Sequence, residues 1–240
     1  RASWGQGYRF PSMAELFIST NQSGLEIYPN SGLKPESGWS SEIGVKQGLK
    51  IGKWMGYIDV AAFIQQYNDM MEFSFGIWGE ENDTLGGVGF KSINIGKTQI
   101  SGIEVSLNGQ GKITPNLTVN LIAGYTYMNS MSLNPNTPYA YGRDHGLPRP
   151  SGNGFLDQSY TYKNTSSDAT ILKYRYNHIA KADIEIIYKK LSFGASARYN
   201  SFMKNIDLIF TLLGSEEGPI PGVNDAREKF NDGDLIIDLR

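Results

Sequence analysis

The sequence predicts an all-β fold, an antiparallel up-and-down transmembrane β-barrel, of which these 240 residues supply about eight strands. Apolar and polar residues alternate over long segments, as in a strand that has one face in apolar surroundings and the other in polar surroundings. The connections between those segments are alternately very short and very long, which is typical of outer-membrane barrels. Aromatic residues, which strands favour, make up 12% of the chain.

The strands are predicted from a period of two in hydrophobicity. In the segment 103–108, Ile103 and Val105 would share one face, and Glu104 and Ser106 the other. We expect one barrel domain over residues 1–240, with both chain ends inside strands. The predicted strands lie near residues 1–8, 38–49, 54–72, 92–109, 117–129, 178–189, 191–203 and 233–240.

The connections indicate that the two ends of the sheet differ. Compact soluble domains rarely carry loops longer than roughly 15 residues, so several long loops in a row favour a barrel whose long loops all lie at one end. In the first long loop, Ser12 would cap one helical turn that ends near Phe17. Short connections lie at 51–53, 109–116 and 189–190, and long ones at 9–37, 73–91, 130–177 and 204–232.

The polar face suits a wet lumen better than a dry core. It would carry Glu104, Asp183, Glu185 and Arg198, whose burial without water would be costly. Aromatic residues near the strand ends are typical of the girdles at the two membrane interfaces. They are Trp4, Tyr8, Trp39, Trp54, Tyr57, Tyr125, Tyr127, Tyr188 and Tyr199.

Composition excludes several function classes. With 22 Lys and Arg against 24 Asp and Glu, the net charge of −2 argues against a nucleic-acid partner. The chain has no Cys and only two His, so we expect no thiolate or multi-histidine metal site. No nucleophile or phosphate-loop motif occurs in the context that it needs. We therefore expect neither an enzyme nor a bound cofactor.

The candidate ligand contacts lie in predicted loops, where binding residues concentrate. The segment 139–149 combines aromatic rings, arginines that could bind carboxylate or phosphate, and a histidine. A second candidate is a tryptophan in the loop 73–91. Each could instead pack structurally on its neighbours, and His178 would order a loop at the rim. The candidates are Trp78, Tyr139, Tyr141, Arg143, His145 and Arg149.

Four segments resemble one known family, the TonB-dependent outer-membrane receptors. Residues 1–17, RASWGQGYRFPSMAELF, resemble its "gyR.Ps..EL" segment, and residues 30–44 resemble its "N..LkPE....E.G" pattern. Residues 94–104 resemble its "N.gk....GiE" strand, with Gly102 in place. Residues 172–183 resemble its "yRp.H" strand, although Tyr176 stands where proline is common. The four matches occur in the family's order and span nearly the whole chain.

The resemblance implies a barrel of about 22 strands with a plug in its lumen, of which these strands would be the thirteenth to the twentieth. It implies location in the bacterial outer membrane and uptake of a scarce ligand: an iron-siderophore, haem, cobalamin or a glycan. The implied partners are membrane lipid, the energy-coupling protein TonB and, in the glycan-importing branch, a surface lipoprotein. TonB would act through an N-terminal segment and a plug that this chain does not include.

Two alternatives remain open. A passive porin or adhesin barrel would share the architecture, and a preceding plug domain would distinguish the receptor from it. A soluble β-sandwich that binds or cleaves carbohydrate would keep its apolar face inside and remain in solution without detergent.

Overall fold

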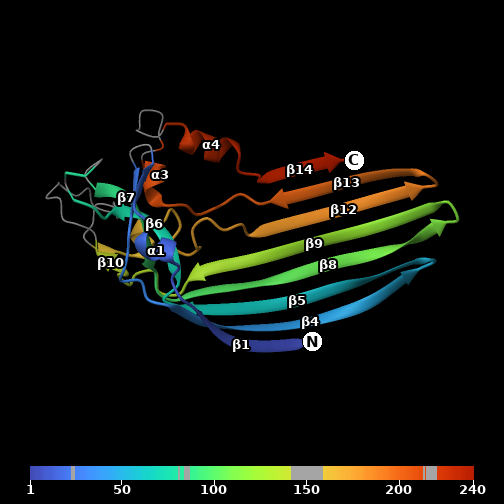
Figure 1. Ribbon diagram of the computed structural model, residues 1–240, viewed down its shortest axis with the longest axis horizontal. Helices are drawn as coiled ribbons and strands as arrows, with labels where there is room; N and C mark the ends of the chain where they lie inside the picture. The colour runs from blue at the N-terminus through green and yellow to red at the C-terminus, as the bar shows by residue number, and fades with distance from the viewer. Residues whose placement is uncertain (23–24, 81, 84–86, 142–158, 213, 215–220) are drawn as a thin grey trace.

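The computed structural model describes residues 1–22, 25–80, 82–83, 87–141, 159–212, 214 and 221–240, and its main feature is an eight-stranded antiparallel sheet. All eight predicted strands are confirmed, and they form one wall in which every strand pairs with the next (Figure 1). In order, the wall strands are β1 (Ala2–Arg9), β4 (Glu36–Ile51), β5 (Trp54–Asn68), β8 (Thr98–Thr114), β9 (Leu117–Ser132), β12 (His178–Tyr188), β13 (Leu191–Asn200) and β14 (Asp234–Leu239). The wall is not closed, because β1 and β14 are its two edges.

Three hairpin turns define one end of the wall, which we call the turn end. The strand bounds leave only Gly52 and Lys53 between β4 and β5, Pro115 and Asn116 between β8 and β9, and Lys189 and Lys190 between β12 and β13. Gly52 has a φ of 63°, a left-handed conformation that glycine adopts without strain. All long connections lie at the opposite end, the loop end, as predicted (Figure 1).

The long connections fold into a cap that the alternation pattern did not predict. The cap holds a four-stranded sheet in the order β2 (Thr20–Gln22), β3 (Leu25–Tyr28), β7 (Val88–Asn94) and β6 (Met71–Ile77). It also holds the short pair β10 (Ala140–Tyr141) and β11 (Ser159–Tyr160). Its helices are α1 (Met13–Phe17), α2 (Tyr162–Thr165), α3 (Leu208–Leu212) and α4 (Val223–Lys229). None of the helices in the described segments is long and apolar enough to cross a membrane.

Three predicted strands were too long: the one predicted over 191–203 ends at Asn200, and two others are interrupted. The strand predicted over 54–72 ends at Asn68, and the strand predicted over 92–109 divides into β7 and β8. At these breaks Asp69 and Gly96 have φ values of 53° and 94°, which no strand residue can keep. The backbone N–H of Met70 donates to the Gly96 carbonyl at 3.0 Å, so the two breaks hold each other. Both chain segments therefore pass between the wall and the cap sheet at the same point.

The expected helical turn is confirmed as α1. In α1, the Ser12 hydroxyl accepts from the Glu15 backbone N–H at 3.2 Å, and the Glu15 carboxylate accepts from the Ser12 N–H at 2.7 Å. This capping box satisfies two N–H groups that would otherwise lack partners.

Strand pairing separates the wall into two faces. Directly opposed residues share a face, and Val60 lies opposite Val45 on one side and Val105 on the other. The same row continues through Tyr125, Ala180, Tyr199 and Leu235. This outer face is apolar and uncovered by described residues; Val45, for example, is 68% exposed.

The opposite, inner face is polar. Its central row runs through Lys46, Asp59, Ser106, Gly124, Lys181 and Arg198. The described hydrophobic core lies instead in the cap, where Ile93, Ile95, Tyr162 and Leu172 pack together. The wall therefore needs an apolar medium on its outer face and water on its inner face.

Eight of the nine aromatic residues predicted for the girdles lie on the outer face, but Tyr125 lies near mid-strand, opposite Val105. Trp54 is only 8% exposed because its ring lies flat over Gly56 and Gly109, where an added Cβ would come within 2.8 and 2.1 Å of it. Tyr57 was wrongly assigned to the outer girdle. It lies on the inner face, opposite Gly48 and Asn108, with the Lys46 ammonium 3.7 Å from its ring centroid.

The two faces should differ in their tolerance of charge. Val105→Arg places a cation on the outer face near mid-strand and should lower the free energy of unfolding by about 2–4 kcal/mol in a bilayer. Ser106→Arg, one residue further on the inner face, should lower it by much less. Urea unfolding of the full-length protein in lipid vesicles would measure both, and equal losses would contradict the assignment of the faces.

Candidate functional site

A pocket of about 440 Å³ opens in the cap, next to the rim of the wall. We call it the cap pocket. Residues from five connections and from the cap strands β7 and β10 line it, so it exists only when the cap is folded. Among them are Asn30, Lys34, Asp69, Trp78, Lys91, Asn94, Asn134, Tyr139 and Tyr141.

The cap pocket brings together three of the six predicted ligand contacts. Trp78, Tyr139 and Tyr141 all line it, although Trp78 and Tyr141 are far apart in the sequence. The other three, Arg143, His145 and Arg149, lie outside the described residues.

The three aromatic residues differ in their availability. Tyr141 is 73% exposed, so its ring is free to stack on a ligand. Trp78 is half-buried, with its ring centroid 4.8 Å from that of Tyr160 and its indole N–H donating to the Ser74 carbonyl at 3.3 Å. It is therefore a fixed platform.

Tyr139 is mainly structural. Its hydroxyl lies 2.8 Å from the Thr165 hydroxyl, and it packs against the buried cluster of the cap. Burial raises the pKa of Tyr139, so the ring stays neutral.

Asparagines that sequence analysis did not select build the pocket frame. The Asn94 amide donates to the carbonyls of Lys34 and Asp69 at 2.9 and 2.7 Å, which ties β7 to the ends of two wall connections. The Asn134 side chain accepts from the Lys97 N–H at 2.9 Å. Asn94 could have been found from its place at the start of the 94–104 motif. The amides bind backbone groups, so these hydrogen bonds link the connections that line the pocket.

Two lysines give the cap pocket positive charge. The half-buried Lys91 ammonium makes no hydrogen bond or ion pair with any described residue, and it lies 5.7 Å from the Trp78 ring centroid. Burial lowers the pKa of Lys91. Lys34 lines the same pocket. An unpaired cation beside aromatic rings is suited to an anionic group on a flat or hydroxyl-rich ligand. Within the described residues, no group of three His, Asp or Glu side chains could hold a metal ion.

A buried ion pair joins segments of the cap. The Lys173 ammonium lies 2.5 Å from one Asp207 oxygen and donates to the Ser74 hydroxyl at 3.2 Å. The Tyr174 hydroxyl donates to the other Asp207 oxygen at 2.7 Å. Both charged side chains are 1% exposed. Three connections distant in sequence are thereby joined, and removing either charge would leave the other buried and unpaired.

Glu72 is a second buried carboxylate in the same cluster. Its Oε1 has no hydrogen-bond partner, and the nearest Arg175 nitrogen lies 3.8 Å away. Burial raises the pKa of Glu72 to about 7, against the opposing effects of Lys173 and Arg175 and with a further increase from Asp207.

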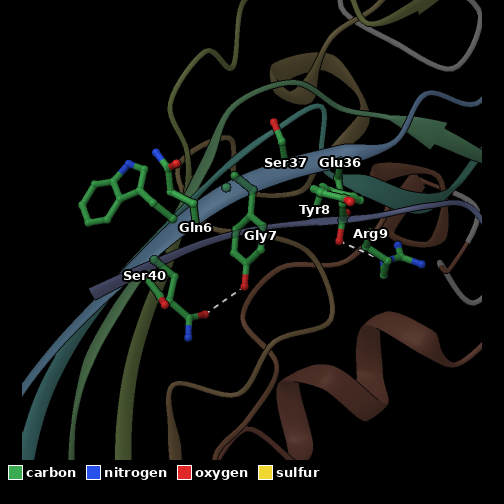
Figure 2. A pocket seen from close by; sticks show the side chains of 12 residues that line it. Gln6, Gly7, Tyr8, Arg9, Glu36, Ser37 and Ser40 are labelled. Carbon is green, nitrogen blue, oxygen red and sulfur yellow. Dashed lines mark hydrogen bonds and ion pairs between the residues drawn. The ribbon is translucent and has the colours of Figure 1, made fainter. Parts of the chain in front are cut away.

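A second hollow, of about 350 Å³, lies along β1 and β4 near the rim (Figure 2). Gly5, Gly7 and Gly38 line it, and Tyr67 covers Gly38, where an added Cβ would lie 3.2 Å from the ring. Figure 2 shows Arg9 paired with Glu36, the Nε to Oε1 distance being 2.9 Å. The glycines of this hollow lie on the edge strand β1 and on its neighbour β4. The hollow is therefore an open part of the inner rim and not a closed site.

Glu72 makes cap stability depend on pH. Its folded-state pKa of about 7 exceeds its ordinary value of 4.5, so the folded cap binds this proton more tightly than the unfolded chain does. The stabilisation is complete below about pH 4.5 and is lost as the pH rises through about 7, with a magnitude on the order of 3 kcal/mol. Hydrogen exchange of residues 71–77 and 159–177, corrected for intrinsic rates, should be faster at pH 8 than at pH 5.

Glu72→Gln is the matched variant for that measurement. It should remove most of the pH dependence from both cap segments and leave exchange in β8 unchanged. An unaltered pH dependence in this variant would assign the effect to another group.

No curated protein matches the chain. The Serratia marcescens haemophore receptor HasR, solved as a double mutant with its haemophore HasA and haem, is 16% identical, with a TM-score of 0.48 over 83% of this chain and 29% of that one. The copper transporter OprC is also 16% identical, with a TM-score of 0.46 over 99% of this chain and 27% of that one. This chain therefore spans less than a third of the length of either protein.

The family model described as "TonB dependent receptor-like, beta-barrel" matches residues 1–208, which include seven of the eight wall strands and most of the cap. The match covers well over half of the 240 residues. The chain therefore belongs to the TonB-dependent receptor-like β-barrel family.

Proposed function

We propose that this chain is wall and cap of an outer-membrane receptor that captures a scarce ligand and imports it with energy delivered by TonB. The observation that carries the proposal is the cap pocket, which sits at the loop end of a two-faced wall and combines exposed aromatic surface with two lysines that have no side-chain partner among the described residues. Family membership supports the transport role and argues for a receptor and against an enzyme.

In this proposal the outer face contacts lipid and the inner face lines the lumen. The loop end faces the cell exterior, and the turn end faces the periplasm, as in other outer-membrane barrels. The cap pocket would then meet the ligand first. A plug elsewhere in the polypeptide would close the lumen, and TonB would act on that plug.

The pocket chemistry favours a ligand with both a flat or hydroxyl-rich surface and a negative charge. Trp78 and Tyr141 would offer stacking surface, and Lys34 and Lys91 would bind carboxylate or phosphate. Among the ligand classes of this family, iron-siderophores, haem, cobalamin and acidic glycans are the candidates to test. Arg143, His145 and Arg149 stay proposed contacts, because they follow Tyr141 directly in the chain.

Energy dependence distinguishes this function from a passive porin or adhesin. Uptake of the identified ligand by cells that express the full-length protein should stop when a protonophore collapses the proton-motive force. Uptake that continues at an unchanged rate would support the porin instead.

Two pocket variants should weaken ligand binding without unfolding the cap. Tyr141→Ala removes an exposed ring, and Lys91→Gln removes the unpaired cation; each should lower affinity about tenfold, since about 1.4 kcal/mol corresponds to that factor. Affinity would be measured by titrating the full-length receptor with haem, ferric siderophores, cobalamin and acidic oligosaccharides.

The matched control is Lys163→Gln, an exposed lysine of α2 outside the cap pocket. It should bind the same ligand with unchanged affinity. If Tyr141→Ala and Lys91→Gln also bound normally, the cap pocket would not be the ligand site.

A further inference from the structure

Charge is unevenly distributed between the two ends of the wall. Five lysines gather at the turn end, and the segments 47–58, 105–122 and 186–195, which form its hairpins, contain no Asp or Glu. Because the whole chain carries −2, these five leave a net −7 on the other residues. We call this set the lysine band. It consists of Lys50, Lys53, Lys112, Lys189 and Lys190.

The lysine band has no internal counter-charge. All five side chains are exposed, and none forms a hydrogen bond or ion pair with a described residue. The Lys189 ammonium lies 5.4 Å from the Tyr188 ring centroid. Exposed like charges repel one another, so an anionic partner would stabilise the turn end.

The arrangement of the band follows the sheet. Lys50 and Lys53 belong to the β4–β5 hairpin, Lys112 to the β8–β9 hairpin, and Lys189 and Lys190 to the β12–β13 hairpin. Every hairpin of the wall therefore contributes at least one cation at the same end. A row of this kind fits a plane of charge and not a compact protein epitope.

Apolar side chains border the band on the outer face. Ile51 is 70% exposed and pairs with Trp54, and Leu191 is 75% exposed and pairs with Tyr188. Lys53 and Lys190 are directly adjacent to these pairs in the chain. Apolar and aromatic groups followed at once by lysines match the change from acyl chains to phosphate groups at a membrane interface.

We propose that the lysine band binds the headgroup phosphates of anionic phospholipids, such as phosphatidylglycerol, in the leaflet on the turn side. The apolar outer face would thus hold the wall among the acyl chains, and the lysine band would hold its turn end at the headgroup phosphates. This surface is separate from the cap pocket and depends only on the wall lying in a bilayer. Failure of the ligand experiments above would leave it standing.

The test uses the full-length receptor in nanodiscs that contain equimolar phosphatidylglycerol and phosphatidylcholine. Native mass spectrometry would measure the ratio of the two lipids that remain bound. The unaltered protein should retain an excess of phosphatidylglycerol. The variant K53Q/K189Q/K190Q should lower that ratio at least fivefold, since even one lysine near an anionic surface contributes on the order of 1 kcal/mol.

Two controls make the result specific. K53R/K189R/K190R keeps the charge and should keep the preference. K97Q/K204Q/K229Q removes three exposed lysines from the loop end and should not change the ratio. The proposal is overturned by no change in the turn-end glutamine variant, by an equal fall in the loop-end variant, or by a fall in the arginine variant.

Discussion

Direct antiparallel pairing across eight strands is the constraint on which the remaining structure depends. Because paired residues share a face, the row from Val45 through Val60 and Val105 to Tyr125 is apolar in every strand. A slip of one residue in any strand would move its apolar set to the inner face and its charges outward. The alternation in the sequence therefore specifies register as well as strand identity, and register produces the two surroundings that the wall requires.

The cap is stable for a different reason. It has a small core and no continuous hydrogen-bonded wall, so specific polar contacts hold its connections in place. The breaks at Asp69 and Gly96 bring two segments out of the wall together, and the Lys173–Asp207 pair joins segments that meet only in the folded state. A buried ion pair adds little net stability relative to apolar packing, but it strongly penalises any arrangement that separates its charges. The ion pair thus gives the cap a defined geometry and makes it less tolerant of other arrangements. The geometry of the cap pocket depends on this arrangement.

The wall could be predicted from the sequence because its signal is local. A period of two and the loop lengths identified all eight strands and the end at which the loops gather. The cap could not be predicted in this way, because its core joins Ile93 and Ile95 to Tyr162 and Leu172. Asp69 stopped a strand through its backbone conformation, which alternation does not encode. Among the site residues, the aromatic content of the loops led to Trp78 and Tyr141. Lys91 lies in the loop predicted over 73–91 but was not selected, because its lack of a partner among the described residues is a property of the fold alone.

Charge distribution links the wall and the cap to recognition. Outside the lysine band the chain is net negative, yet Lys34 and Lys91 of the cap pocket have no side-chain partner among the described residues. At physiological ionic strength, exposed charges are screened beyond about 8 Å. The negative charge elsewhere on the chain therefore repels a distant anion only weakly, whereas the lysines attract strongly an anion that is already in contact. Such a pocket gains little from long-range attraction and much from contact. It would bind anions whose shape fits Trp78, Tyr141 and Lys91, and it would reject small ions that contact only the charged group. Selection at contact is the property that a receptor for a dilute, structured ligand needs.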